Sequence, residues 1–349
     1  MNISKKQDAI IHARESRVVV IASAAAGKTT VLTERVKCLL EQGVSPLKIV
    51  VITFTNAAAE SLYERVGQVQ GLFIGTIHSY ANYLLRSAGI DTSDMLDQEQ
   101  FDLLFPTIKA NLHCIKEVEH LLLDESQDST EVQLDFMLDM VKPKNYMLVG
   151  DFRQSIYRFA GAEPDYLLNL SKDPTVQTYD LNENYRNGRR ILEYAKYLIG
   201  LAGYDYYDHS LAMRPIDGKV VEVEYSPTAI ARTIKKMGNY HDWFVLTRTN
   251  DQCDEMMREL GREDVPCSTF KRSQLTNKEL YHLMDEDKVK VMTIHTSKGL
   301  EAPNVVVIGA KFYNIEEKCV SYVAATRARD LLVWARTQPR NRRTVSSWE

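Results

Sequence analysis

A loop of small residues lies between the β-branched run Arg17–Ala22 and the helical pattern Thr29–Glu41. The backbone N–H groups of such a loop and the N-terminus of the following helix carry partial positive charge, so together they can cradle phosphate oxygens. Lys28 would reach the β- and γ-phosphates of ATP, and the Thr29 hydroxyl would hold Mg²⁺. A purely structural turn is the alternative. The residues expected to form this phosphate loop are Ala22, Ser23, Ala24, Ala25, Ala26, Gly27, Lys28, Thr29 and Thr30.

Two carboxylates follow another apolar run. Asp124 and Glu125 come directly after His120–Leu123. Ligands of open parallel sheets bind at the carboxyl ends of strands, so both side chains are expected to face a ligand. Asp124 can then coordinate Mg²⁺, and Glu125 can position and deprotonate the attacking water. An N-cap cluster for the next helix is the alternative; it accounts for Asp128 but gives Asp124 and Glu125 no role.

Short β-branched runs identify the elements that must position these residues. Several runs are continuously apolar, as in parallel strands that helices cover on both faces. Helical patterns lie between them, so the sequence predicts an α/β fold with parallel sheets flanked by helices. The expected strands are Arg17–Ala22, Lys48–Phe54, Phe73–Thr76, His120–Leu123, Tyr146–Val149, Val220–Tyr225, Trp243–Thr247, Lys290–Thr293, Val305–Ile308 and Leu331–Trp334.

The length of 349 residues predicts two domains, at roughly 150 residues per domain. Asp, Pro and Thr cluster between residues 172 and 180, which places the expected boundary between domains 1–178 and 179–335. Residues 336–349 contain four arginines and no periodicity, and are expected to form a flexible basic tail. This tail is either a solvated chain end or an auxiliary contact to nucleic acid or a partner.

The composition excludes several classes of protein. Apolar residues make up 44% and charged residues 26%, which excludes a disordered or low-complexity chain. The net charge of −4 excludes recruitment of nucleic acid by a chain-wide basic field, so any such site is local. Five widely spaced cysteines argue against a disulfide framework, and no apolar run reaches the length of a membrane span. A reducing cytoplasm is therefore expected.

Taken together and in order, the motifs resemble the UvrD/Rep-type helicases of superfamily 1. The resemblance covers most of the chain. It implies two tandem RecA-like lobes with ATP bound in the cleft between them. The segments that carry it are Ile3–Ile10, Ala22–Thr29, Thr53–Arg65, Gly75–Leu85, Leu121–Asp128, Val149–Ala162, Leu181–Asn187, Val245–Asn250, Val291–Glu301 and Tyr322–Arg329.

The resemblance also implies roles for residues outside the phosphate loop. Gln7 would hydrogen-bond the adenine, Tyr185 would stack on it, and Glu301 would contact the nucleotide from the second lobe. Gln154 would sense the γ-phosphate and link ATP to DNA.

Two arginines, Arg186 and Arg327, resemble the family's arginine fingers. Charge that develops on the γ-phosphoryl oxygens needs fixed guanidinium donors, and donors placed across a cleft act only when it closes. An ordinary surface ion pair is the alternative for each of them.

Aromatic side chains in loops mark the expected DNA track, because single strands bind by base stacking together with phosphate contacts. Phe54, Tyr157 and Phe159 follow strand ends and match family positions that stack on bases. A core position is the alternative for Phe54, and a hydrogen-bonded half-buried histidine is the alternative for His295. The other residues expected to contact the strand are Asn56, Thr76, His78, His295 and Lys298.

The sequence also departs from the family pattern. Ser23 and Ala25 stand where glycines are usual, Ala160 where an arginine commonly follows the aromatic, and Ala302 where a phenylalanine is common. Two segments where the family usually carries bulky insertions are short here, at residues 86–118 and 251–288. The first is expected to be a small helical piece, and much of the second should complete its own lobe.

The expected function is that of an ATP- and Mg²⁺-dependent translocase and helicase on single-stranded DNA, with the family's 3′ to 5′ polarity. Its expected partners are single-stranded DNA and junctions with duplex, with the protein acting as a monomer in a bacterial or phage-infected cytoplasm. The alternative is an ATP-gated clamp or adaptor that grips single-stranded DNA and needs a protein partner for unwinding.

Overall fold

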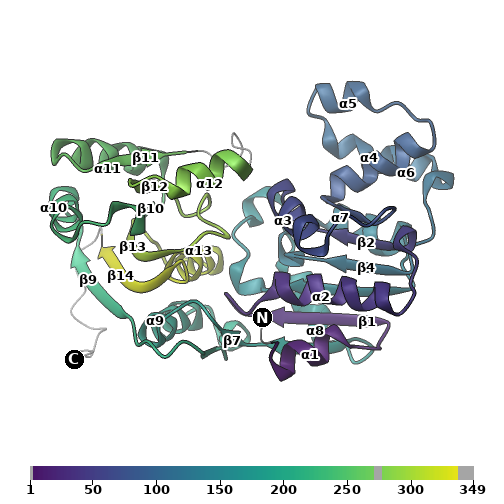
Figure 1. The fold of residues 1–349 in the computed structure, drawn as a ribbon, viewed down its shortest axis with the longest axis horizontal. Coiled ribbons are helices and arrows are strands. Elements are labelled where there is room, and N and C mark those ends of the chain that lie inside the picture. Colours follow the sequence, from purple (N-terminus) through teal and green to yellow (C-terminus); the bar gives the residue numbers. More distant parts are fainter. Residues whose placement is uncertain (1–2, 271–276, 337–349) are drawn as a thin grey trace. The chain divides into compact units, whose positions relative to one another are not determined.

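The computed structural model of the chain describes residues 3–270 and 277–336 (Figure 1). Its residues divide into two compact units, Met1–Glu183 and Asn184–Glu349. Each unit contains one six-stranded sheet, and every strand pair in these sheets is parallel. The α/β prediction with parallel sheets is therefore confirmed.

The sheet of the first unit has the strand order β3-β2-β4-β5-β1-β6. Its central strands are buried along almost their whole length, as their continuously apolar sequences predict. The strands are β1 (Arg17–Ala22), β2 (Ile49–Ile52), β3 (Phe73–Gly75), β4 (His120–Leu123), β5 (Asn145–Gly150) and β6 (Gln177–Leu181).

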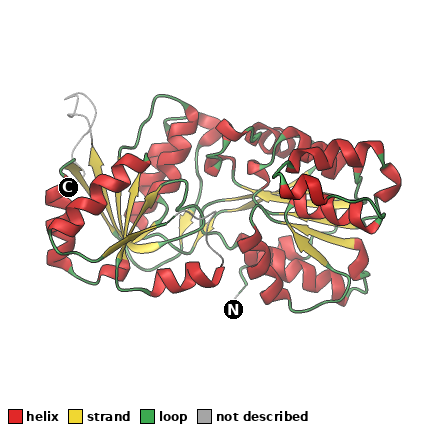
Figure 2. Ribbon diagram, turned by 90° about the horizontal axis from the view of Figure 1, so that it is seen from above, coloured by secondary structure: helices red, strands yellow, loops and turns green. Residues whose placement is uncertain are grey.

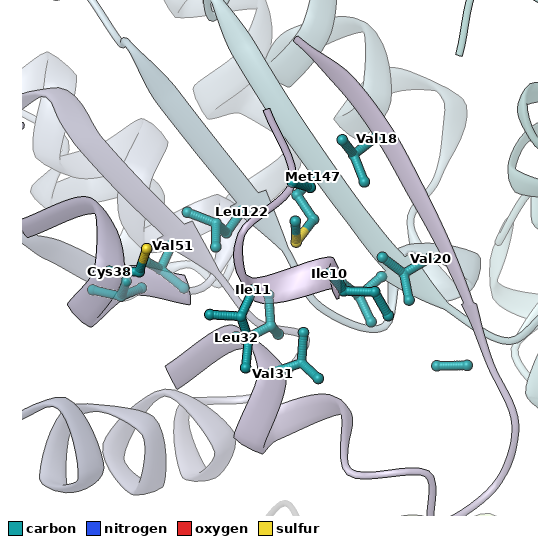
Figure 3. Packing of buried hydrophobic residues seen from close by; sticks show 14 of the residues in the cluster. Ile10, Ile11, Val18, Val20, Val31, Leu32, Cys38, Val51, Leu122 and Met147 are labelled. Carbon is teal, nitrogen blue, oxygen red and sulfur yellow. The ribbon is translucent and has the colours of Figure 1, made fainter. Parts of the chain in front are cut away.

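Helices α1, α2 and α3 of the first unit share one hydrophobic core with the sheet. Figure 3 shows Ile10 and Ile11 of α1 beside Val31 and Leu32 of α2, with Val20 of β1 close by. The α-helices are α1 (Lys5–Ile11), α2 (Lys28–Glu41), α3 (Asn56–Val66), α4 (Ile77–Ser87), α5 (Ser93–Asp97), α6 (Leu104–Ala110), α7 (Glu131–Asp135) and α8 (Pro164–Ser171); a π-helical turn, Phe136–Met140, follows α7.

The sheet of the second unit has the order β11-β12-β10-β13-β14-β9 and fans out between helices (Figure 2). Helices α10 and α11 form a core with its strands around the fully buried Trp243. The strands are β9 (Lys219–Glu224), β10 (Trp243–Thr247), β11 (Cys267–Thr269), β12 (Val289–Thr293), β13 (Ala302–Ile308) and β14 (Ala328–Arg336). The helices are α9 (Arg189–Gly200), α10 (Pro227–Met237), α11 (Asn250–Arg262), α12 (Asn277–Asp285) and α13 (Ile315–Ala325). A separate pair joins β7 (Glu183–Asn184) to β8 (Leu211–Ala212).

The boundary between the units lies later than the predicted one between residues 178 and 179. That division would cut β6, which pairs with β1 along five residue pairs and so belongs to the first sheet. The short segment 86–118 is mostly helical, with α5 and α6. Segment 251–288 supplies most of α11 and the edge strand β11. Arg336 ends β14 and is not part of a tail, and residues 337–349 lie outside the described residues.

Two further expectations concern membrane-spanning segments and disulfide bonds. In the described part of the chain, none of the helices has the length and apolar character needed to cross a bilayer. Within the same ranges no cysteine forms a disulfide.

Candidate functional site

The phosphate loop leads from the end of β1 into α2, as its sequence predicts. Gly27 adopts a left-handed conformation, with φ 85°, immediately before α2. The positive φ favours glycine, and a Cβ at this position would lie 2.6 Å from Nε2 of Gln7 and push that side chain away. Ala25 is also left-handed, with φ 56°, although an alanine pays a steric cost there. The loop is therefore a tightly turned segment that directs backbone groups toward the helix N-terminus.

Gln7 lies against this loop. Its Nε2 donates to the carbonyl oxygen of Ala26 at 3.2 Å, and the side chain is buried. A capping box with Ser4 at the start of α1 holds Gln7 in place, because each residue's side chain bonds the other's backbone N–H. The predicted adenine-reading residue is thus positioned next to the phosphate loop.

Lys28 and Glu125 form an ion pair, with 2.8 Å between Nζ and Oε1. Burial alone would lower the pKa of Lys28, but the negative charges of Glu125, Asp124 and Asp151 outweigh it and raise that pKa. Glu125 is left-handed, with φ 50°, and its N–H donates to Oδ1 of Asp124 at 2.9 Å. A cation and two carboxylates therefore meet where β4 ends, while the N-cap of α7 is Thr130.

The donor set at this edge fits Mg²⁺. Asp124 is a largely buried carboxylate close enough to Lys28 to raise its pKa, and Thr29 is in the first turn of α2. Mg²⁺ is usually held by one or two carboxylates, with phosphate and water completing its shell. Among residues 3–270 and 277–336 no group of three His, Cys, Asp or Glu side chains that could hold a metal ion is found.

A buried hydrogen-bond network behind Glu125 was missed by sequence reasoning. Gln127 donates from Nε2 to Oε2 of Glu125 at 2.6 Å and accepts from the N–H of Asp151 at 2.9 Å. Asp151 in turn accepts from Nε of Arg153 at 2.6 Å and from Nε2 of Gln154 at 2.8 Å. Asp151 directly follows β5, just as Asp124 follows β4, so the same positional signal could have found it.

Arg153 extends the network back to the phosphate loop. Its Nη2 donates to Oγ of Ser23 at 3.3 Å, and its guanidinium is almost fully buried beside Asp151. Ser23 occupies a position where the family usually has glycine, and here its hydroxyl accepts a hydrogen bond. The phosphate loop, the predicted γ-phosphate sensor Gln154 and the predicted base Glu125 thus belong to one connected set of side chains.

The three predicted stacking aromatics gather in the first unit. The rings of Phe54 and Tyr157 are stacked, with centroids 5.2 Å apart and planes 26° apart. The Phe159 ring lies 6.2 Å from that of Tyr157 and is 72% exposed. Phe54 is 41% exposed, so the core alternative for it is wrong.

Two of the three predicted polar contacts of the first unit, Thr76 and His78, make contacts within the fold. Thr76 caps α4 through a capping box with Ser79, and Asn56 is an exposed residue in the first turn of α3. His78 packs its ring near Phe105, at 5.2 Å between centroids. Of the three, Asn56 has the most accessible side chain.

In the second unit, Arg186 and Glu301 form an ion pair. Arg186 also donates from Nη1 to the carbonyl oxygen of Thr326 at 3.2 Å. Burial would raise the pKa of Glu301, but the charge and hydrogen bond of Arg186 dominate and lower it. The neighbouring Tyr185 is 43% exposed. Two residues predicted to contact the nucleotide therefore bind each other in this unit.

Arg327 is deeply buried, with 2% of its surface exposed. Its guanidinium donates to the carbonyl oxygens of Val323 at 3.0 Å and Leu300 at 3.3 Å, and to the Thr326 hydroxyl at 3.1 Å. The surface ion-pair alternative for Arg327 is therefore wrong. Of the predicted strand contacts here, His295 is half-buried and Lys298 is buried.

Two protein-family models match the chain. The model described as the UvrD/REP helicase N-terminal domain matches residues 3–104 and 96–175. The model described as the UvrD-like helicase C-terminal domain matches residues 270–338. Each model falls in a different unit, in the order that the motifs predict.

Several curated proteins are similar to the chain. The ATP-dependent DNA helicase Rep of Buchnera aphidicola is 30% identical over 215 residues, covering 58% of this chain and 33% of that protein. A probable DNA helicase of Mycoplasma pneumoniae is 25% identical over 448 residues, covering 95% and 82%. The ATP-dependent DNA helicase PcrA of Leuconostoc citreum is 25% identical over 376 residues, covering 76% and 49%.

The lengths of these relatives matter for the comparison. The chain spans about half the length, or less, of several curated relatives that it matches. The alignment to the Mycoplasma pneumoniae protein is longer than the 349 residues of this chain, so that relative carries insertions that are missing here.

Proposed function

Because this chain belongs to the UvrD/Rep helicase family, we propose that it hydrolyses ATP and uses the energy to move along single-stranded DNA. The observation that carries the proposal is the contact between Lys28 and Glu125 at the carboxyl edge of the first sheet. It joins the cation of the phosphate loop to a carboxylate that can act as a base. The names of the relatives, which include ATP-dependent DNA helicases, support the same activity.

The ion pair suggests how the base is released. Lys28 keeps its charge at neutral pH because its pKa is raised, so the phosphates of ATP would compete with Glu125 for it. Once displaced, the Glu125 carboxylate is still held by Gln127, which orients it to accept a proton from the attacking water. Asp124 and Thr29 would hold Mg²⁺, which when bound neutralises charge on the phosphate oxygens.

The buried network offers a path from nucleotide to DNA. Gln154 is bonded to Asp151, and the same loop continues to Tyr157 and Phe159. A γ-phosphate that bonds Gln154 would change its contact with Asp151 and so bias the position of the aromatic loop. Differential contacts of this kind are what a ligand needs to shift a conformational equilibrium.

The second unit is proposed to complete the ATP site in the way the family resemblance implies. Tyr185 would stack on the adenine opposite Gln7, and Glu301 would contact the nucleotide. Arg186 and Arg327 would stabilise charge on the γ-phosphate, so that hydrolysis depends on closure of the cleft between the lobes. Repeated closure and opening would move the protein along the strand in the 3′ to 5′ direction.

A DNA-stimulated ATPase assay tests the proposal. Purified protein with ATP and Mg²⁺ should release phosphate slowly alone and several-fold faster when an oligothymidylate is added. Equal rates with and without the strand would contradict the motor assignment.

A strand-displacement assay separates a helicase from an ATP-gated clamp or adaptor. Duplexes with a 3′ tail should be unwound and those with a 5′ tail should not, which also fixes the polarity. A clamp would bind both tails in an ATP-dependent way without displacing either strand. Unwinding that appears only after addition of cell extract would favour an adaptor with a protein partner over the monomeric motor that we propose.

A further inference from the structure

Each of the two sheets consists of six parallel strands, although the strands are connected in a different order. Strand β5 lies between β4 and β1 inside the first sheet, and strand β13 lies between β10 and β14 inside the second. Each of these strands is followed by a loop and then by a helix, α8 or α13, after which the chain returns to the same sheet. The loops after β5 and β13 therefore both lie at the carboxyl edges of their own sheets, where open α/β folds bind ligands.

The loop after β5 carries the aromatics Tyr157 and Phe159. The loop after β13 carries Lys311, Phe312 and Tyr313, which again combine two aromatics with a cation, as Tyr157, Arg158 and Phe159 do. The Tyr313 ring is 71% exposed, close to the 72% of Phe159, and Phe312 is 37% exposed. Burying a ring stabilises a fold, so a large ring held at the surface is available to a ligand.

Contacts to three elements hold this second loop. Gly309 begins it in a left-handed conformation, and a Cβ there would lie 2.6 Å from Nε2 of Gln252. The carbonyl oxygen of Lys311 accepts a hydrogen bond from the Ser321 hydroxyl at 3.1 Å. Phe312 lies 6.2 Å from the ring of Trp334 on β14. The backbone of the loop is thus fixed by the sheet and by α13.

The exposed ring itself is held at its edge. The Tyr313 hydroxyl donates to Oε1 of Glu317 at 3.3 Å, and Glu317 is clamped by Arg248, whose Nη2 is 2.6 Å from the same oxygen. The hydroxyl carries this hydrogen bond, and the 71% exposure of Tyr313 leaves ring surface for stacking beside Lys311. Nζ of Lys311 lies 5.9 Å from the ring centroid, where it could also meet a phosphate of a stacked strand.

We propose that Lys311, Phe312 and Tyr313 form a second base-stacking site for single-stranded DNA, carried by the second unit. The site rests on the proposed function, because it needs a protein that binds such a strand. Its chemistry is that of sequence-independent binding: an aromatic face for any base and a cation for the backbone. A strand gripped by both units can be passed from one to the other during an ATP cycle.

The test measures binding of a fluorescein-labelled oligothymidylate of about 20 nucleotides by anisotropy. Tyr313→Ala should bind it about fivefold to about 150-fold more weakly than the wild type, whereas Tyr313→Phe, which keeps the ring, should bind within about twofold. Tyr204→Ala is the matched control, since Tyr204 is 91% exposed in the same unit but lies in a 3₁₀ turn after α9. It should bind like the wild type, and all variants should keep the ATPase rate measured without DNA.

Photocross-linking is a second measurement, because it identifies the residues that lie next to the bound strand. An oligonucleotide carrying 5-iododeoxyuridine should photocross-link to a peptide that contains Tyr313 as well as to one that contains Phe159. Unchanged binding by Tyr313→Ala, or cross-links at Phe159 without any at residues 311–313, would overturn the second site and leave the proposed function standing. Failure of the wild type itself to bind the strand would overturn the proposed function, and the second site with it.

Discussion

The predicted catalytic residues of the two units make different kinds of contact. In the first, Lys28, Glu125 and Asp124 meet at one edge of the sheet, where opposite charges are already in contact. In the second, Arg327 donates to groups of its own unit, and Arg186 is paired with Glu301. The first site therefore has its charges in place for a phosphate, while the second holds its arginines by internal contacts.

This difference suggests that the residues of the two units act at different stages of the ATP cycle. A site whose charges are already gathered can bind ATP with one local exchange, in which a phosphate replaces Glu125 as the partner of Lys28. An arginine that is bonded internally must exchange partners, or use its remaining donors, to reach a phosphate. Contacts of this kind suit residues that act only at one stage of a cycle. Variants that remove each of these contacts test this comparison between the two units.

The largest effect is expected from Lys28→Ala. Loss of the cation that raises phosphate affinity and pairs with Glu125 should reduce ATP turnover to background, a loss of at least about 10²–10³-fold. Steady-state phosphate release measures this. The matched control is Lys37→Ala, which removes a partly exposed lysine of α2 that pairs with Glu34; its turnover should equal that of the wild type. Substantial hydrolysis by Lys28→Ala would remove the phosphate loop from the mechanism.

Glu125→Gln should separate binding from chemistry. The amide keeps the shape of the side chain but cannot take a proton, so hydrolysis should fall by about 10²–10⁴-fold. Binding of a fluorescent ATP analogue should persist, since Lys28 is freed from its carboxylate partner. Glu131→Gln, an exposed position at the start of α7, serves as the control. A normal rate in Glu125→Gln would exclude this residue as the base.

The second unit offers a comparison of two arginines. Arg327→Ala leaves buried carbonyl oxygens without their donor and should lower the unfolding free energy of the second unit by about 1–3 kcal/mol. Arg186→Ala, whose partner Glu301 is 40% exposed, should cost less than about 1 kcal/mol. Trp243 and Trp334 are both buried in this unit, so denaturant titration followed by tryptophan fluorescence reports on it.

Both arginine variants should also slow ATP hydrolysis if they act on the γ-phosphate. Arg258→Ala, an exposed residue of α11, should change neither stability nor rate. Equal losses of unfolding free energy in Arg327→Ala and Arg186→Ala would contradict the expectation that the more deeply buried arginine stabilises its unit more.

The smallest expected effect concerns acid stability. The lowered pKa of Glu301 means that its pairing stabilises the fold above the pKa of the unfolded chain, near 4.3, and that this contribution is lost as the pH falls. Glu301→Gln should therefore be less stable than the wild type at pH 7, by about 0.5 kcal/mol at this partly exposed site. The gap should close in strong acid. Glu224→Gln on β9 is the control, and a gap that widened in acid would contradict the sign.

Much of the fold could be predicted because the central strands are continuously apolar. Arg17–Ala22, His120–Leu123 and Trp243–Thr247 have the bounds expected from their sequences. Strand β6 was missed since it contains polar residues and is largely accessible to solvent. Its place is fixed by pairing with β1, and no local pattern reports that pairing.

The candidate site, too, could be predicted only where local sequence patterns report on it. Motif order and residue type were enough to name Lys28, Glu125 and the aromatics. They did not reveal Arg153, whose importance comes from its contacts with Asp151 and Ser23. The hydrogen bond to Ser23 joins residues that are far apart along the chain, so it exists only because β1 and β5 are neighbours in the sheet.

By itself, the sequence determined the α/β class, the phosphate loop and the chemical types available for a nucleotide and a strand. Those features depend on local periodicity, on turn geometry and on side-chain chemistry, and short stretches of sequence determine all three. Only the tertiary structure decided that Lys28 meets Glu125, that Phe54 stacks on Tyr157 and that Arg186 is held by Glu301. Strand order brings distant residues together, and burial then fixes the strength and the partners of their charges.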